Sequence, residues 1–309
     1  LLEYQYMTTD ALFGVPAQVS ATYVVLFVIF GAMAERFGVG KLFMDFALAL
    51  TGQAAGGPAK VAVLTSGLFG SVSGSAVANV MTTGTFTIPL MKRIGYRPQF
   101  AGAVESVAST GGQLMPPIMG AAAFVMAEFM GVSYLTVAGY ALLPALLYFL
   151  AVYLAVHFEA RKHGMKGLPK ADLPRLGKVI KDEGHLFLPI FIIIGTLMSG
   201  YSAPFSALAG ILSVVPIVLA RKTTRKEFSV PKLIDALRAG AINSIPVALA
   251  CASAGIVIGV IAQTGVGLTF TGLVRTLAGH HLLLALVLTM VAGIILGMGM
   301  PTTPAYIVQ

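Results

Sequence analysis

The chain has 309 residues, of which 57% are hydrophobic and 10% charged, and its formal net charge is +8. Soluble domains carry about 25% charged residues, so a single soluble domain is excluded. Several apolar runs reach about 18 residues, the length that crosses the hydrocarbon core of a bilayer, which predicts an all-α polytopic membrane protein.

The sequence carries no motif that indicates an enzyme, a metal-binding protein or a nucleic-acid-binding protein. The five histidines have no metal-ligand spacing, and there is no HExxH, GxSxG or Walker-type motif, so we expect neither an enzyme nor a transition-metal site. A single cysteine, Cys251, excludes an internal disulfide. The basic residues lie in loops between apolar runs, which explains the charge without nucleic acid. The sequence begins with Leu1 and shows no signal peptide, so we expect the chain to begin inside a longer protein.

The basic loops give an orientation for the apolar segments, because Lys and Arg accumulate on the cytoplasmic side. In chain order these segments cover 17–35, 59–91, 99–128, 133–157, 185–200, 203–220, 239–262 and 281–300. Loop 159–184 carries seven basic residues and loop 221–238 carries six. Two spans separate these loops, so both lie on one side. Nineteen of the 20 basic residues then share the cytoplasmic side, and Arg275 alone lies opposite.

The apolar stretch 59–91 joins two basic residues that this orientation places on the same side, Lys60 and Lys92. It is therefore predicted to enter the membrane and return as a re-entrant hairpin. The alternative is an ordinary span, which would place the two most basic loops outside.

A shift of 227 residues aligns the chain with itself without a gap. Gly38-Val39-Gly40 falls on Gly265-Val266-Gly267, Gly70 on Gly297, and Ser75 on Thr302. The two copies start on opposite sides, which predicts inverted repeats of the kind found in secondary transporters; the alternative is chance similarity between two apolar sequences.

We expect the first repeat to cover 1–184, with a span, an in-plane helix, the hairpin 59–91, a broken span 99–128, a scaffold span 133–157 and a cytoplasmic loop. Linking spans and a truncated second repeat, with a hairpin tip near 297–304, fill 185–309. Because Gln309 aligns with Thr82, the sequence is expected to be a fragment of a larger permease.

Two neighbouring segments carry candidate site residues. Unwound backbone at membrane depth persists only where it is buried in protein or lines a cavity, and its carbonyls, together with hydroxyl and amide oxygens, suit Na⁺. The alternatives are a packing patch of small residues at the tip and a kinked structural helix at the break. The predicted cation or substrate ligands of the first tip are Gly70, Ser71, Ser73, Ser75 and Asn79. Those of the broken span, where Gly and Pro interrupt a helix, are Ser109, Thr110, Gly111, Gly112, Pro116 and Pro117.

The second tip and one carboxylate complete the candidates. Gly297, Gly299, Pro301, Thr302 and Thr303 are expected to form an equivalent tip that enters from the opposite face. Glu105 lies within an apolar span, and intramembrane carboxylates are functional candidates. It is either a proton- or ion-linked carboxylate or the partner of a basic loop residue.

These segments resemble one family. Gly14-Val15-Pro16, Ser73 to Asn79, Thr82 to Met91 and Ser109 to Pro117 are similar to the large membrane (M) subunit of tripartite ATP-independent periplasmic (TRAP) transporters, particularly permeases with fused small and large subunits. Gly297 to Thr303 resembles that family's second hairpin.

The resemblance implies elevator-type import of organic acids across the bacterial or archaeal inner membrane, coupled to Na⁺ or alternatively H⁺. It also implies an extracytoplasmic binding protein and a small membrane subunit or its fused equivalent. The first tip and the Ser109–Gly112 break would form one cation site, and Thr302 and Thr303 would contribute to a second. The alternatives are a stand-alone divalent-anion/Na⁺ symporter and a non-transporting membrane scaffold subunit.

Overall fold

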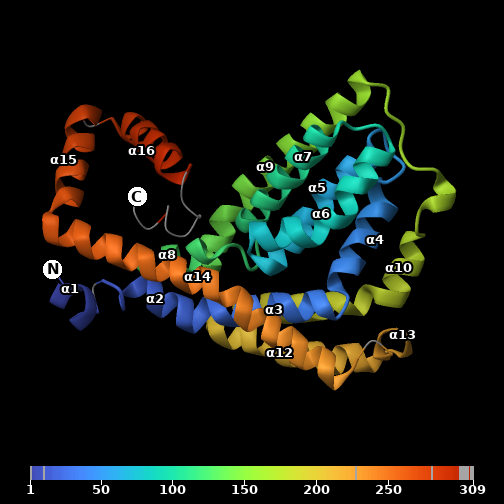
Figure 1. Cartoon of the computed structure of the whole chain (residues 1–309), viewed down its shortest axis with the longest axis horizontal. Helices are drawn as coiled ribbons and strands as arrows, with labels where there is room; N and C mark the ends of the chain where they lie inside the picture. The colour runs from blue at the N-terminus through green and yellow to red at the C-terminus, as the bar shows by residue number, and fades with distance from the viewer. Residues whose placement is uncertain (1, 10, 227, 280, 299–305, 307–309) are drawn as a thin grey trace. The chain divides into compact units, whose positions relative to one another are not determined.

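The computed structural model describes residues 2–9, 11–226, 228–279, 281–298 and 306 (Figure 1). All regular secondary structure among these residues is helical, which confirms the predicted all-α class. The chain divides into two compact units. The larger unit comprises Leu26–Gly120 and Tyr134–Ile242, and the smaller comprises Leu1–Val25, Ala121–Ser133 and Asn243–Gln309.

The larger unit contains most of the helices. They are α3 (Val25–Arg36), α4 (Val39–Thr51), α5 (Gly57–Ser73), α6 (Ala76–Arg93), α7 (Pro98–Gly111), η2 (Gly112–Leu114), α9 (Tyr134–Lys162), η3 (Lys170–Asp172), α10 (Leu176–Glu183), η4 (Gly184–Phe187), α11 (Leu188–Met198), α12 (Ala203–Ala220), α13 (Lys222–Arg225) and the first part of α14 (Val230–Thr264). The short η2, η3 and η4 are 3-10 helices.

The predicted hairpin segment forms two helices, α5 and α6, that pack against each other. Helix α5 begins after Gly56 and ends at Gly74, and both glycines adopt left-handed φ values, of 67° and 63°. Glycine pays no steric penalty there, so it is suited to both ends of the helix. The Ser75 side chain then caps α6 by accepting a hydrogen bond of 3.3 Å from the Ala78 amide.

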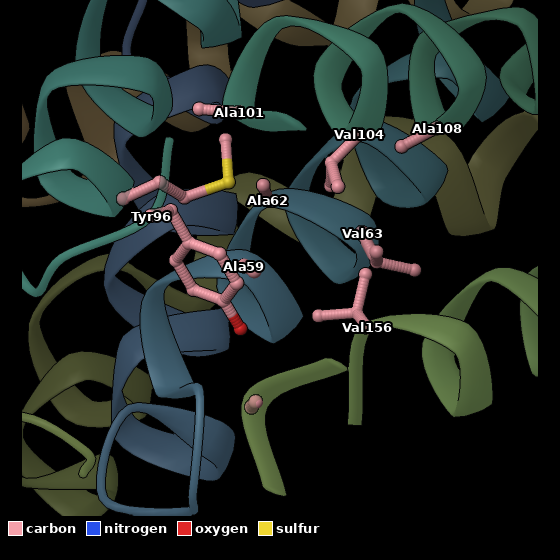
Figure 2. Close-up of a cluster of buried hydrophobic side chains, with 10 residues drawn as sticks. Ala59, Ala62, Val63, Tyr96, Ala101, Val104, Ala108 and Val156 are labelled. Carbon is pink, nitrogen blue, oxygen red and sulfur yellow. The ribbon is translucent and has the colours of Figure 1, made fainter. Parts of the chain in front are cut away.

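Helices α5, α6, α7 and α9 lie side by side in the larger unit (Figure 1). A cluster of buried side chains, most of them small, fills the space between them (Figure 2). Small residues let helix backbones approach closely, which is how membrane helices gain packing contacts. The members of the cluster are Ala59, Ala62, Val63, Met91, Tyr96, Ala101, Val104, Ala108, Val156 and Ala160.

Among the described residues, four helical segments are long and apolar enough to cross a membrane: Val15–Arg36, Tyr134–Lys162, Ala203–Ala220 and Val230–Thr264. Two further predicted apolar segments also fall on helices. Segment 185–200 is a 3-10 turn followed by α11, which has 11 residues and ends at Met198. Segment 239–262 belongs to α14, which has 35 residues and begins at Val230, because charged residues before an apolar run do not stop a helix.

The smaller unit contains α1 (Leu2–Met7), α2 (Val15–Val19), the π-helix η1 (Ser20–Val24), α8 (Ala121–Met130), the rest of α14, α15 (Val266–Ala278) and α16 (Leu282–Gly297). Gln5 Nε2 donates to the Ile256 carbonyl at 3.2 Å. The Tyr23 and Phe124 rings stack with centroids 5.9 Å apart. These contacts hold the N-terminal helices against α14 and α8.

Two helices have matching bounds at the shift of 227 residues. Helices α4 and α15 each have 13 residues, and each follows a left-handed glycine, Gly38 or Gly265. This agreement supports the internal repeat. The inverted orientation and the 1–184/185–309 division stay predictions.

Candidate functional site

The tip of the α5–α6 hairpin lies against the point where α7 breaks, and both belong to the larger unit. Helix α7 ends at Gly111, a single 3-10 turn follows, and the irregular residues Met115–Gly120 lead to α8. Two consecutive prolines, Pro116 and Pro117, prevent the helix from continuing there.

Gly70 and Gly112 form the closest approach between the tip and the break. A Cβ atom added to Gly112 would lie 2.5 Å from Gly70 Cα, closer than real Cβ contacts occur. A Cβ atom added to Gly70 would likewise collide with Gly112 Cα. Glycine is therefore required at both positions because the two backbones are in direct contact.

Asn79 lies beside this backbone crossing and is fully buried. Its Nδ2 atom donates to the Ser66 carbonyl at 2.8 Å, which ties α6 to α5. The same nitrogen would lie 3.1 Å from a Cβ atom on Gly112. The Asn79 amide thus faces both helices of the hairpin and the break in α7.

Further hydrogen bonds fix the irregular backbone after the break. The Ile118 amide donates to the Ser71 carbonyl at 3.1 Å, and the Gly120 amide donates to the Gln113 carbonyl at 2.8 Å. The Tyr134 hydroxyl, at the start of α9, donates to the carbonyl groups of Pro117, at 3.0 Å, and Ile118. These bonds satisfy backbone groups that a broken helix leaves without partners.

A second polar centre lies deeper between the same helices. Glu105 of α7 is fully buried, and four hydroxyl groups surround its carboxylate. Ser66 and Ser109 donate to Oε1 at 3.1 Å each; Thr83 also donates to Oε1, and Thr87 donates to Oε2. No basic side chain forms an ion pair with Glu105 in the described part of the chain. Of the two predicted roles, the loop ion pair is therefore absent from the described residues.

The two centres are continuous. Thr83 Oγ1 lies 3.2 Å from Asn79 Oδ1 and also contacts Glu105. Ser66 accepts from Asn79 through its carbonyl and donates to Glu105 through its hydroxyl. A chain of buried oxygen and nitrogen atoms therefore runs from the tip to the carboxylate. Most of its atoms are hydroxyl, carbonyl and carboxylate oxygens. Groups of three or more His, Cys, Asp or Glu suited to a transition metal are absent from the described residues.

The structure brings only some of the predicted site residues together. Gly70, Asn79 and Gly112 meet at the crossing, and Ser71 joins them through its backbone. The other predicted residues of this region have separate roles. Ser109 donates a hydrogen bond to Glu105, Gly111 packs against Tyr148, and Ser75 caps α6. Pro116 and Pro117 lie in the irregular segment, and the exposed Thr110 donates a hydrogen bond to the Ser106 carbonyl. The Ser73 hydroxyl is buried without a hydrogen-bond partner among the described atoms.

Four residues of this site were not among the predicted ligands: Ser66, Thr83, Thr87 and Tyr134. Thr83 and Thr87 follow Asn79 at steps of four residues, so they lie on the same face of α6 as Asn79. That spacing is visible in the sequence. Nothing local in the sequence marks Ser66 or Tyr134.

The second predicted tip is mostly outside the described residues. Gly297 ends α16. Gly299, Pro301, Thr302 and Thr303 lie outside the part of the chain that the structure describes, so their predicted role stays a prediction.

These observations define a class of protein: a multi-pass membrane protein in which a helical hairpin packs against a broken helix. Residues 1–309 match the family described as the DctM component of the tripartite ATP-independent periplasmic transporter. The chain belongs to this family, which confirms the predicted resemblance. The family is one of transporters rather than enzymes, also as predicted.

Curated relatives agree with this assignment. Over 184 residues the chain is 33% identical to the C4-dicarboxylate TRAP transporter large permease protein DctM of Pseudomonas aeruginosa, covering 59% of this chain and 42% of that protein. Over 186 residues it is 30% identical to the sialic acid TRAP transporter large permease protein SiaM of Vibrio cholerae, covering 60% and 43%. Over 283 residues it is 26% identical to the 2,3-diketo-L-gulonate TRAP transporter large permease protein YiaN of Escherichia coli, covering 91% and 65%. The chain thus spans about half of its curated relatives' length, and at most 65% of these three.

Proposed function

We propose that this chain forms part of a secondary transporter that imports organic carboxylates across the inner membrane, coupled to Na⁺. An extracytoplasmic binding protein would deliver the substrate, and a small membrane subunit, separate or fused, would complete the permease. The substrates in the names of the three relatives, a C4-dicarboxylate, sialic acid and 2,3-diketo-L-gulonate, are all carboxylates. Their common chemistry supports the substrate class.

The observation that carries the proposal is the contact between the hairpin tip and the break in α7. Gly70 and Gly112 bring two interrupted backbones together, and the buried Asn79 lies beside them. Interrupted helices that meet in this way are the usual construction of ion and substrate sites in secondary transporters. Simple helix packing would not need a buried amide at the crossing.

Different groups at the tip suit a cation and a carboxylate. The Ser73 hydroxyl is buried without a partner, so it can offer its oxygen to a cation at no cost in lost hydrogen bonds. The first turn of α6 starts at the tip after Ser75, and its free amides favour an anion. Na⁺ would bind among the oxygens of the tip and the break, and the substrate carboxylate beside the start of α6.

The proposed mechanism is of the elevator type. Hairpin and broken helix would move together as one body, because the Glu105 hydroxyl cluster ties α5, α6 and α7 to one another. The matching bounds of α4 and α15 support a second copy of this arrangement in the full permease.

The experiment is substrate uptake into proteoliposomes that contain the full-length permease. The labelled substrate is the compound that co-purifies with the candidate binding protein, supplied with or without that protein and with or without an inward Na⁺ gradient. Uptake that needs both the binding protein and Na⁺ is the expected result. Uptake without the binding protein would instead identify a stand-alone symporter, and uptake driven by a pH gradient alone would replace Na⁺ by H⁺.

A non-transporting scaffold subunit is the alternative from another class. It predicts no uptake under any gradient while the protein stays folded. It also predicts that Ser73, Ser75, Asn79 and the Gly111-Gly112 break tolerate substitution while expression is unchanged.

A further inference from the structure

A pocket lies at the end of α9 in the larger unit, away from the hairpin tip. Its volume is about 380 Å³. Residues on one side come from the turn between α6 and α7 and the start of α7, and residues on the other come from the last turns of α9 and the loop that follows it. The lining residues are Ile94, Gly95, Tyr96, Arg97, Phe100, Glu159, His163, Gly164, Met165 and Lys166.

The pocket is positively charged. Two basic side chains, Arg97 and Lys166, line it together with the imidazole of His163 and a single carboxylate, Glu159. That carboxylate is already paired with His163, at 3.1 Å. In the described part of the chain, no carboxylate lies within ion-pair distance of Arg97 or Lys166. Two cations at the mouth of the pocket are thus left for an external anion.

Backbone amides at the start of α7 add donors to the pocket, whereas the neighbouring Tyr96 hydroxyl is buried. Helix α7 starts after Arg97 with no side-chain cap, so its first amides lack helical partners. Tyr96 is 3% exposed, and its hydroxyl has no hydrogen-bond partner among the described atoms. Burial, with a smaller effect of the Glu159 charge, raises the pKa of Tyr96 to about 12. The hydroxyl lies beside Gly56, where an added Cβ atom would come within 2.5 Å of it, so it belongs to the core behind the pocket rather than to the ligand-facing surface.

Aromatic and apolar side chains lie beside the polar groups of the pocket. The Tyr96 and Phe100 rings stack with centroids 5.4 Å apart and planes 8° apart. The pocket residues Glu159 and His163 continue, at steps of four, an exposed row on α9 that consists of Leu147, Ala151 and Ala155. Exposed Leu154 and Phe158 flank this row. Helix α9 is long and apolar enough to cross the membrane and is little buried within the described part of the chain, so we expect this row to be open to lipid.

We propose that this pocket binds the phosphate headgroup of an anionic phospholipid whose acyl chains lie along the exposed row of α9. Basic pockets at the cytoplasmic ends of membrane helices recognise such headgroups, and the excess of Lys and Arg places this end of α9 on the cytoplasmic side. A lipid suits the site better than free phosphate does, because the cationic mouth and the apolar row are continuous. The inference is independent of the proposed transport activity.

The test is native mass spectrometry of the full-length permease with added phosphatidylglycerol, with phosphatidylcholine as the neutral comparison. The variant Arg97→Gln/Lys166→Gln is expected to lower the population of bound phosphatidylglycerol about tenfold. The matched control is Arg175→Gln/Lys178→Gln, which removes the same two charges from exposed positions elsewhere in the same basic loop region. It should bind phosphatidylglycerol as wild type does, and the charge-conserving Arg97→Lys/Lys166→Arg variant should restore binding.

Three outcomes would overturn the proposal. The first is equal loss in the two Gln variants, which would indicate a general effect of surface charge. The second is equal binding of phosphatidylglycerol and phosphatidylcholine by the wild type. The third is displacement of the lipid by millimolar inorganic phosphate, which would assign the pocket to a free anion. All variants alter exposed side chains, and an unchanged melting temperature shows that each is folded.

Discussion

Gly112 in the break of α7 and Gly70 in the hairpin are in direct backbone contact: a Cβ atom on Gly112 would lie 2.5 Å from Gly70 Cα. The two residues are more than forty positions apart in the sequence. Their contact holds the tip of a helical hairpin against the break of another helix.

We predict that Gly112→Ala destabilises the full-length permease by about 1–3 kcal/mol, the usual cost of forcing a methyl group into a filled site, and abolishes uptake. Gly102→Ala is the matched control, because a Cβ atom there would have no neighbour within 4 Å. Thermal unfolding in detergent and uptake in proteoliposomes measure both effects. Equal behaviour of the two variants would contradict the close approach.

The Asn79 amide is predicted to be necessary for transport. Asn79→Ala removes the hydrogen bond to the Ser66 carbonyl and the amide oxygen proposed to serve the cation. Expression should stay intact while uptake is lost, and Ser75→Ala should behave in the same way because it removes the cap of α6. Wild-type uptake in both variants would rule out the assignment of this tip as the site.

Glu105 is predicted to hold the three helices together. Glu105→Ala leaves four hydroxyl groups without their shared acceptor and opens a cavity, which we expect to cost about 2–5 kcal/mol. Glu105→Gln keeps the shape and one oxygen acceptor, so its loss should be smaller. The control is Glu128→Gln, since Glu128 is exposed. The melting temperature should be highest for Glu128→Gln, lower for Glu105→Gln and lowest for Glu105→Ala. A Glu105→Ala protein as stable as the Glu128→Gln control would refute the cluster's structural role.

The Tyr134 hydroxyl is predicted to fix the irregular segment that follows the break. Tyr134→Phe removes its bonds to the Pro117 and Ile118 carbonyls and should lower stability by about 1–2 kcal/mol. Tyr140→Phe is the comparison, because Tyr140 is 79% exposed on the same helix. If the unfolding curves of the two variants coincide, the Tyr134 hydroxyl does not contribute to stability.

Local signals in the sequence were sufficient for the helix breaks. Gly74 with Ser75 ends one helix and begins the next, and Pro116-Pro117 prevents another from continuing. Each acts on its own backbone, through left-handed φ, capping or a missing donor. Such features can be predicted without knowing what lies opposite.

Contacts between distant segments could not be predicted in the same way. The sequence marks Glu105 as unusual, but only the fold shows that Ser66, Thr83, Thr87 and Ser109 surround it. Similarly, the sequence does not show that Gly70 must be glycine, because this requirement comes from its contact with Gly112. Helix α14 begins nine residues before the apolar segment 239–262, because Lys232, Asp235 and Arg238 interrupt the apolar pattern without ending the helix.

The central claim is that the hairpin tip and the break in α7 together bind the coupling cation. Its most direct test is hydrogen–deuterium exchange of the full-length permease in Na⁺ and in an equal concentration of K⁺. Peptides covering residues 70–80 and 109–118 should exchange more slowly in Na⁺, peptides from loop 163–175 should be unchanged, and Asn79→Ala should remove the difference. Identical exchange of the tip and break peptides in the two salts would contradict the claim.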